Sequence, residues 1–149
     1  MIAAMVSQLE PATAASLAEA LVVLHVGIVA FVVLGEFAFL AGGAFGWRWV
    51  RRFWLRLAHL GLMLFVAVQA WLGALCPLTE WEQALRRHAG DAGYQGGFIE
   101  DVLARWLYIE APAWAFVAAY SGFALLVLAT WFFVPPQRGG NPATAGKRR

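Results

Sequence analysis

The sequence predicts an all-α integral membrane protein, in which three transmembrane helices are joined by two short amphipathic surface helices on the outer side. Hydrophobic residues make up 62% of the 149 residues and charged residues only 13%, whereas about a quarter of a soluble domain is charged. Three apolar stretches reach the ~20 residues that a helix needs to cross a bilayer. We therefore expect one transmembrane domain at residues 1–134 and a basic, disordered tail at residues 135–149.

The first span is expected at residues 17–40, because this stretch is apolar and is followed by Ala41-Gly42-Gly43. Its ionisable residues are Glu19, His25 and Glu36. Gly27 and Gly35 lie on one face of the expected helix, so they form a strip that another helix can approach closely.

A basic and aromatic loop follows, with four arginines and three tryptophans between Gly46 and Arg56. Such a patch is able to bind nucleic acid, but its place between two apolar stretches is typical of a cytoplasmic loop with interfacial tryptophans. We therefore expect no nucleic-acid partner. The second span is expected at residues 53–75.

An amphipathic cap is expected at residues 76–111. Cys76-Pro77 ends the second span, because proline removes a backbone donor, and Thr79 with Glu82 matches the capping box that opens a helix. Gly90 closes this helix, whose apolar face predicts that it lies on the membrane surface. A second amphipathic segment from Phe98 is too short to span, so it is interfacial or re-entrant.

The third span is expected at residues 112–134, which carry no charge and stop at Pro135-Pro136. Arginine and lysine gather in the first loop and in the C-terminal tail, whereas the segment between the second and third spans is acidic. Because basic loops stay on the cytoplasmic side of a membrane, we expect the N-terminus outside and the C-terminus in the cytoplasm.

The polar residues of the first two spans sort into two layers when each residue is given 1.5 Å of depth. His25 lies near the depth of Gln69 in the outer layer, and Glu36 lies near His59 and Arg56 in the inner layer. A hydrogen bond between His25 and Gln69 and an ion pair between Glu36 and Arg56 would hold the spans together. The functional alternative is a proton or ion path, or a ligand site, at these positions.

No cofactor and no catalytic residue are predicted, because phosphate-binding loops, zinc-type cysteine pairs and metalloprotease motifs are missing from the sequence. Two histidines on spans leave haem b as an alternative, although His25 and His59 differ in expected depth by ~12 Å. Cys76 with His88 leaves a metal ion at the outer surface as a second alternative.

Two blocks of the cap form an outer-surface motif. Its residues are Cys76, Pro77, Thr79, Glu82, Tyr94, Gly96 and Gly97. Together with Leu24-His25 and His59-Leu60, this motif resembles an uncharacterised family of small bacterial inner-membrane proteins, a domain of unknown function. The resemblance covers roughly Leu17 to Val134 and implies a bacterial inner-membrane location and a defined cap, but no activity.

A chain of this size is too small to enclose a transport path alone, and its glycine strips and aromatic faces suit helical partners. The sequence thus favours an accessory, assembly or interaction subunit of a bacterial membrane complex, in contact with lipid and with other subunits or its own copies. Two alternatives stay open. One is a haem- or metal-binding redox protein using His25, His59 and Cys76, and the other is an oligomeric proton or ion conductor built around Glu36 and His25.

Overall fold

The computed structural model describes residues 6–93, 96–107 and 111–137. The regular elements of this part are all helices, and one isolated β-bridge joins Arg52 to Gln137. Three helices are long and apolar enough to cross a membrane: α2 (Pro11–Ala44), α3 (Phe53–Leu72) and α6 (Ala113–Phe133). The predicted all-α class with three apolar helices is confirmed, while most of the predicted tail and Tyr94 lie outside the described residues.

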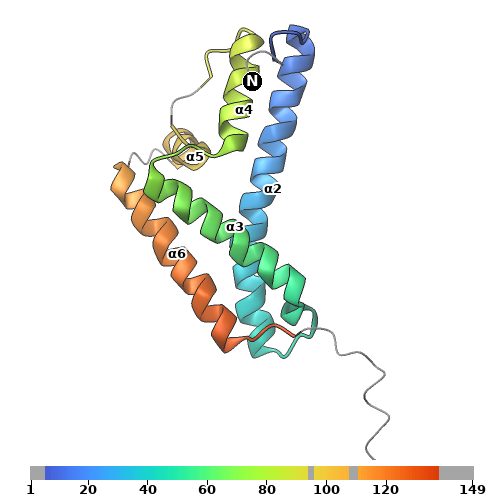
Figure 1. Ribbon diagram of the computed structural model, residues 1–149, viewed down its shortest axis with the longest axis vertical. Helices are drawn as coiled ribbons and strands as arrows, with labels where there is room; N and C mark the ends of the chain where they lie inside the picture. Colours follow the sequence, from blue (N-terminus) through green and yellow to red (C-terminus); the bar gives the residue numbers. More distant parts are fainter. Residues whose placement is uncertain (1–5, 94–95, 108–110, 138–149) are drawn as a thin grey trace, which may run out of the picture.

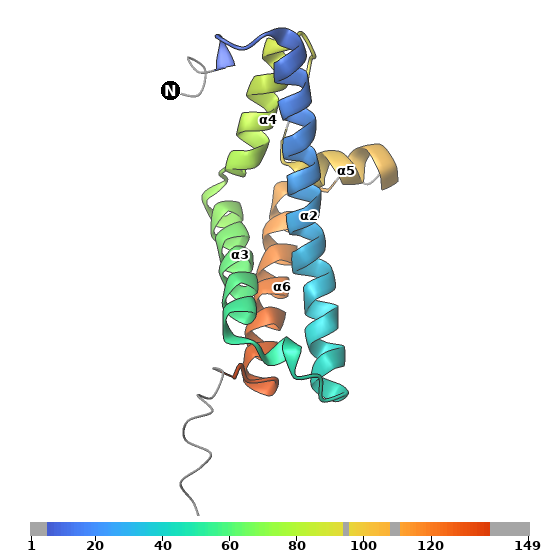
Figure 2. The same cartoon turned by 90° about the vertical axis from the view of Figure 1, so that its right-hand side faces the viewer.

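The first helix is longer than the predicted span. It runs for 34 residues, or about 51 Å, and begins at Pro11. Proline suits this position, because the first backbone N–H groups of a helix have no hydrogen-bond partner within the helix. Its N-terminal part extends beyond the ends of α3 and α6 (Figure 1 and Figure 2). The residues of this extension are rich in alanine, and its Thr13, Ser16 and Glu19 are exposed.

The second span ends at Leu72, three residues earlier than predicted. Gly73 has φ +64°, and the N–H of Ala74 donates to the carbonyl of Gln69 at 3.0 Å, which is how a left-handed glycine closes a helix. Pro77 does not stop this helix but is the first residue of α4 (Pro77–His88), the position that proline favours.

Helix α4 takes its direction from its contact with α2. It does not lie across the ends of the long helices but runs side by side with the N-terminal extension of α2 (Figure 1 and Figure 2). Its Leu85 packs against Ala14 and Ala18 of α2, whose small side chains allow the close approach. α5 (Phe98–Leu107) is the helix that lies crosswise, near the ends of α3 and α6 (Figure 2).

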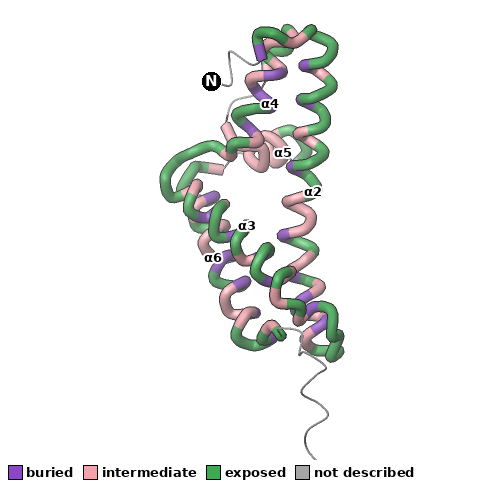
Figure 3. The backbone as a smooth tube through the Cα atoms, turned by 45° about the vertical axis from the view of Figure 1, so that its right-hand side comes forward, coloured by how far each residue is buried: buried purple, intermediate pink, exposed green. Residues whose placement is uncertain are grey.

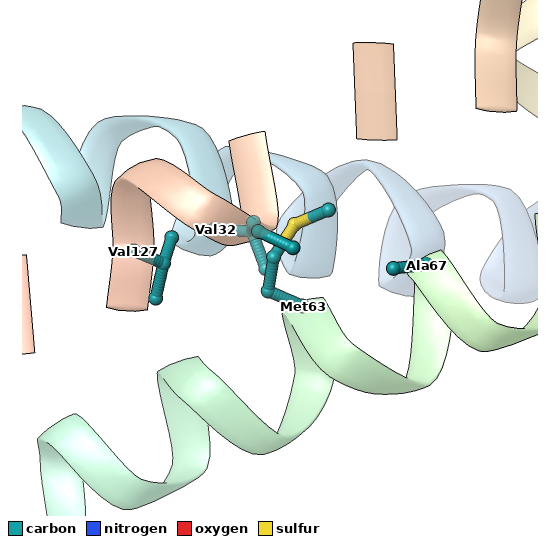
Figure 4. Close-up of a cluster of buried hydrophobic side chains, with 5 residues drawn as sticks. Val32, Met63, Ala67 and Val127 are labelled. Atoms are coloured by element: carbon teal, nitrogen blue, oxygen red, sulfur yellow. The ribbon is translucent and has the colours of Figure 1, made fainter. Parts of the chain in front are cut away.

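The packed interior lies between the three long helices. Val32, Met63, Ala67 and Val127 form its centre, contributed by α2, α3 and α6 (Figure 4). Buried positions follow the inner sides of these helices, while exposed positions face outward (Figure 3). The exposed positions are largely apolar, as for Leu34, Phe37 and Phe65. A second small cluster closes the far end of the bundle, where the short helix η1 (Trp49–Arg51) joins α2 to α3.

Candidate functional site

Four buried polar side chains meet inside the bundle of long helices. Glu36 of α2, Arg56 and His59 of α3, and Thr130 of α6 are each only 1–2% exposed. We call these four residues the buried polar cluster. All three apolar helices contribute to it, and polar groups at such depth in a membrane are costly unless they find partners.

The His59 ring joins α3 to α2. Its Nε2–H donates to the carbonyl oxygen of Val32 at 2.7 Å, which leaves Nδ1 directed toward Glu36, 4.0 Å from Oε2. Gly35 makes this approach possible, because a Cβ atom at that position would lie 3.1 Å from Cδ2 of His59. The sequence placed Glu36 and His59 at one depth, and the structure brings them together.

Thr130 connects α6 to the same carboxyl group. Its hydroxyl donates to Oε1 of Glu36 and also lies 2.9 Å from the carbonyl oxygen of Leu126. A hydroxyl group has one proton and two lone pairs. It can therefore donate a hydrogen bond to an ionised Glu36, or accept a hydrogen bond from a neutral Glu36 while donating to the carbonyl oxygen of Leu126. The cluster accommodates both protonation states of the carboxyl without rearranging the helices.

Arg56 lies at the other side of the cluster and does not form the predicted ion pair with Glu36 within 4.0 Å. Its Nη2 donates to the carbonyl oxygen of Val134 at 3.3 Å, and its guanidinium lies 4.6 Å from the ring centre of Phe39 and 5.8 Å from that of Trp131. The end of α6 and two aromatic faces thus draw the guanidinium away from the carboxylate.

Thr130 was not predicted as a site residue. The third span has no charged residue, so its sequence alone did not indicate a polar site. Thr130 could have been recognised as a partner of Glu36, because it lies near the predicted inner end of the third span, at the depth expected for Glu36 and Arg56.

The structure does not bring His25 and Gln69 together. His25 is 8% exposed and stacks on Phe98 of α5, with the ring centres 4.4 Å apart, whereas Gln69 donates to the carbonyl oxygen of Leu75 at 3.3 Å. Helix α3 lies against α2 near His59, which bonds Val32, and the C-terminal end of α3 diverges from α2 (Figure 1).

The first block of the outer-surface motif opens α4, but without the predicted capping box. Cys76 is the N-cap and makes no side-chain capping bond, and the Thr79 hydroxyl is buried with no hydrogen-bond partner in the described residues. Glu82, only 1% exposed, accepts a hydrogen bond from Nε of Arg86 at 2.7 Å. Helix α4 begins two residues before Thr79, so this side chain lies inside its first turn and faces α2.

The second block opens α5. Gly96 has φ +87°, and the N–H of Gly97 donates to the Glu100 carboxylate at 3.0 Å. Glu100 thereby caps the helix from its third position. Gln83 of α4 donates to the carbonyl oxygen of Gly96 at 3.3 Å, which ties the two cap helices together.

A pocket of about 460 Å³ lies between α2, α4 and α5, and we call it the cap pocket. Ion pairs form one part of its wall. Arg86 contacts Asp91 at 3.1 Å in addition to Glu82, and Arg105 contacts Asp101 at 2.7 Å. The hydrogen bond that Arg86 donates to Glu82 raises the pKa of Arg86, and the hydrogen bond that Arg86 donates to Asp91 lowers the pKa of Asp91. These groups therefore stay charged at neutral pH.

The histidine and cysteine positions do not form ligand pairs within one chain. His59 is bonded to Val32, which lies ~10 Å along α2 from His25, so these two rings cannot flank one iron. Cys76 and His88 are separated by the length of α4, ~18 Å. Among the described residues, no three His, Cys, Asp or Glu side chains are grouped to hold a metal ion.

The fold and the buried polar cluster define a small helical protein with three helices able to cross a membrane. A family model described as Protein of Unknown function (DUF2784) matches residues 15–136, and the chain belongs to this family. This match confirms that the resemblance seen in the sequence points to a domain of unknown function. No curated protein and no solved structure matches the chain.

Proposed function

We propose that this protein is a non-enzymatic interaction subunit of a larger complex in the bacterial cytoplasmic membrane. Helices α3 and α6 have 20 and 21 residues, so each is ~30 Å long, which matches the hydrocarbon core of a bilayer. The arginine-rich segment around η1 lies at one end of these helices and favours that end as the cytoplasmic one. The N-terminus is then outside, with α4 and the extension of α2.

Three outward-facing glycines carry this proposal. Gly27, Gly61 and Gly122 each lie in a different apolar helix, and a Cβ atom built at any of them has no neighbour within 4 Å. Gly35 and Gly42, by contrast, are used for packing inside the chain. Helix contacts within membranes depend on small residues that let two backbones approach. Each span therefore has one outward-facing glycine at which a helix of another protein could pack closely.

The test compares Gly61→Leu with Gly61→Ala after crosslinking in native membranes and mild-detergent purification. We expect a constant companion, either another subunit or a second copy, and expect Gly61→Leu to lower its recovery about tenfold, which corresponds to ~1.4 kcal/mol. Gly61→Ala, with one added methyl group, should retain most of it. Wild-type protein that purifies only as an uncrosslinked monomer would contradict the proposal. Unchanged thermal unfolding of both variants controls for folding.

A second candidate function, proton conduction, is favoured by the geometry of the buried polar cluster. The Glu36 carboxyl can exchange hydrogen-bond direction with Thr130, and it faces Nδ1 of His59 at 4.0 Å, so a proton has a place on either residue. Proton flux into liposomes should fall in Glu36→Gln and stay unchanged in Glu19→Gln, an exposed acid on the same helix. Equal flux in wild type and Glu36→Gln would remove this candidate.

A further inference from the structure

The cap pocket combines charged and apolar walls in a way that suits one class of ligand. Two guanidinium groups, of Arg86 and Arg105, face three carboxylates, of Glu82, Asp91 and Asp101, so the formal net charge of the wall is −1. An anionic ligand would add repulsion to this set, whereas a zwitterion can place its anionic part on the arginines and its cationic part on the carboxylates. The charges therefore favour a ligand with both signs.

The apolar part of the wall indicates that this ligand is a lipid. Val26 of α2 and Phe98 and Trp106 of α5 line the pocket, and Trp106 is 80% exposed. The stacking of Phe98 on His25 fixes α5 against α2 at this place. In the membrane placement proposed above, α5 lies crosswise near the outer ends of α3 and α6, which is the level of lipid headgroups (Figure 2).

We infer that the cap pocket binds the headgroup of a zwitterionic, amine-bearing phospholipid. The phosphate lies against Arg86, whose Nε and Nη1 are used by Glu82 and Asp91 while Nη2 makes no hydrogen bond to another described residue. The ammonium group lies against Asp91 and Asp101, and the glycerol end leaves past Val26 and Trp106. A volume of about 460 Å³ accommodates a headgroup with its glycerol end but not the acyl chains, which remain in the bilayer.

The test is lipid retention by the full chain, measured by native mass spectrometry after reconstitution in equal mixtures of phosphatidylethanolamine and phosphatidylglycerol. We expect at least a fivefold preference for phosphatidylethanolamine in the wild type. Arg86→Gln should abolish the preference, and Arg87→Gln should keep it, because Arg87 is an exposed neighbour on α4 that does not line the pocket. Val102→Trp, which fills the pocket and leaves the ion pairs in place, should abolish it as well.

Three outcomes would overturn the inference. The first is equal retention of the two lipids by the wild type, and the second is a preference that survives Val102→Trp. The third is displacement of bound lipid by soluble phosphoethanolamine at equal concentration, which would identify a free metabolite as the ligand. The inference rests on the proposed membrane placement but not on partner binding. Loss of lipid in Val102→Trp with full recovery of the crosslinked companion therefore separates the two proposals.

Discussion

Thr130→Val tests whether the buried polar cluster holds the three long helices together. Valine has nearly the shape of threonine, and Thr130 is 1% exposed, so the substitution removes a hydroxyl group without opening a cavity. The substitution removes the hydrogen bond to Oε1 of Glu36 and the 2.9 Å contact with the carbonyl oxygen of Leu126 within α6. The other oxygen, Oε2, has no hydrogen-bond partner in the described residues, so Glu36 would be left with none.

The expected loss of stability is about 1.5 kcal/mol. Hydrogen bonds between membrane helices average ~0.6 kcal/mol and reach ~1.7 kcal/mol, because a separated helix also finds polar partners in the membrane. A buried acceptor that loses its donor costs ~1–3 kcal/mol in water-soluble proteins. Glu36 belongs at the upper end of the membrane range, because it is 1% exposed and Thr130 is its direct hydrogen-bonding side chain.

The assay is unfolding by a denaturing detergent, followed by tryptophan fluorescence. Ser16→Ala is the matched control, because this hydroxyl also bonds the carbonyl four residues earlier but lies on the exposed side of α2. It should cost less than ~0.5 kcal/mol. In the Glu36→Leu background, Thr130→Val should lower the free energy of unfolding by less than ~0.5 kcal/mol, because the hydrogen bond between these two side chains is already absent. A Thr130→Val effect no larger than that of Ser16→Ala, or an undiminished effect in the Glu36→Leu background, would refute the reasoning.

Two glycine substitutions give further tests. Gly42→Ala should destabilise the protein by ~1–3 kcal/mol, because its Cβ would lie 2.5 Å from Cγ1 of Val50, whereas Gly27→Ala should be neutral or slightly stabilising in the same unfolding assay. Gly96→Ala should loosen the start of α5 and speed proteolysis before this helix, because Gly96 has φ +87° and an added Cβ atom would lie 2.5 Å from the Glu100 carboxylate. Gly97→Ala should leave the rate of proteolysis unchanged, because an added Cβ atom there would lie at an ordinary 3.7 Å from Cδ of Glu100. Equal rates of proteolysis in both variants would contradict the role assigned to Gly96.

The sequence predicted the apolar helices well because a membrane imposes a length that composition alone reveals. Predicted spans at residues 53–75 and 112–134 became helices at Phe53–Leu72 and Ala113–Phe133. The larger error was in the first helix, which begins six residues before the predicted span. Those six residues are not an apolar stretch, but their three alanines favour helix and proline suits the first helical position, so they continue the same helix.

The partners of the polar residues were harder to predict. Position along each helix was enough to expect that Glu36 and His59 meet, and their side chains lie 4.0 Å apart. The sequence does not predict which neighbouring helix each polar side chain meets, because one sequence does not reveal the angle at which α3 crosses α2. His25 therefore stacks on Phe98, a residue distant in the sequence, and not on the Gln69 expected at its depth.

The contact between α4 and α2 could not be predicted from the amphipathic pattern of α4. An amphipathic pattern shows that a helix has an apolar face but not whether lipid or another helix covers it. Within lipid, apolar burial gives helices little reason to associate, so in the proposed membrane placement Glu36 and His59 add polar contacts to the apolar packing of that half of α2.

Beyond the ends of α3 and α6, apolar burial in water becomes the stronger force, at ~25 cal/mol for each Å² removed from solvent. There α2 exposes Ser16 and Glu19 and packs Ala14 and Ala18 against Leu85 of α4. This change from polar to apolar contacts along one continuous helix is the arrangement expected where α2 leaves the membrane. This arrangement supports the proposed membrane placement, in which α4 lies in water beside α2 and the cap pocket lies at the boundary below it.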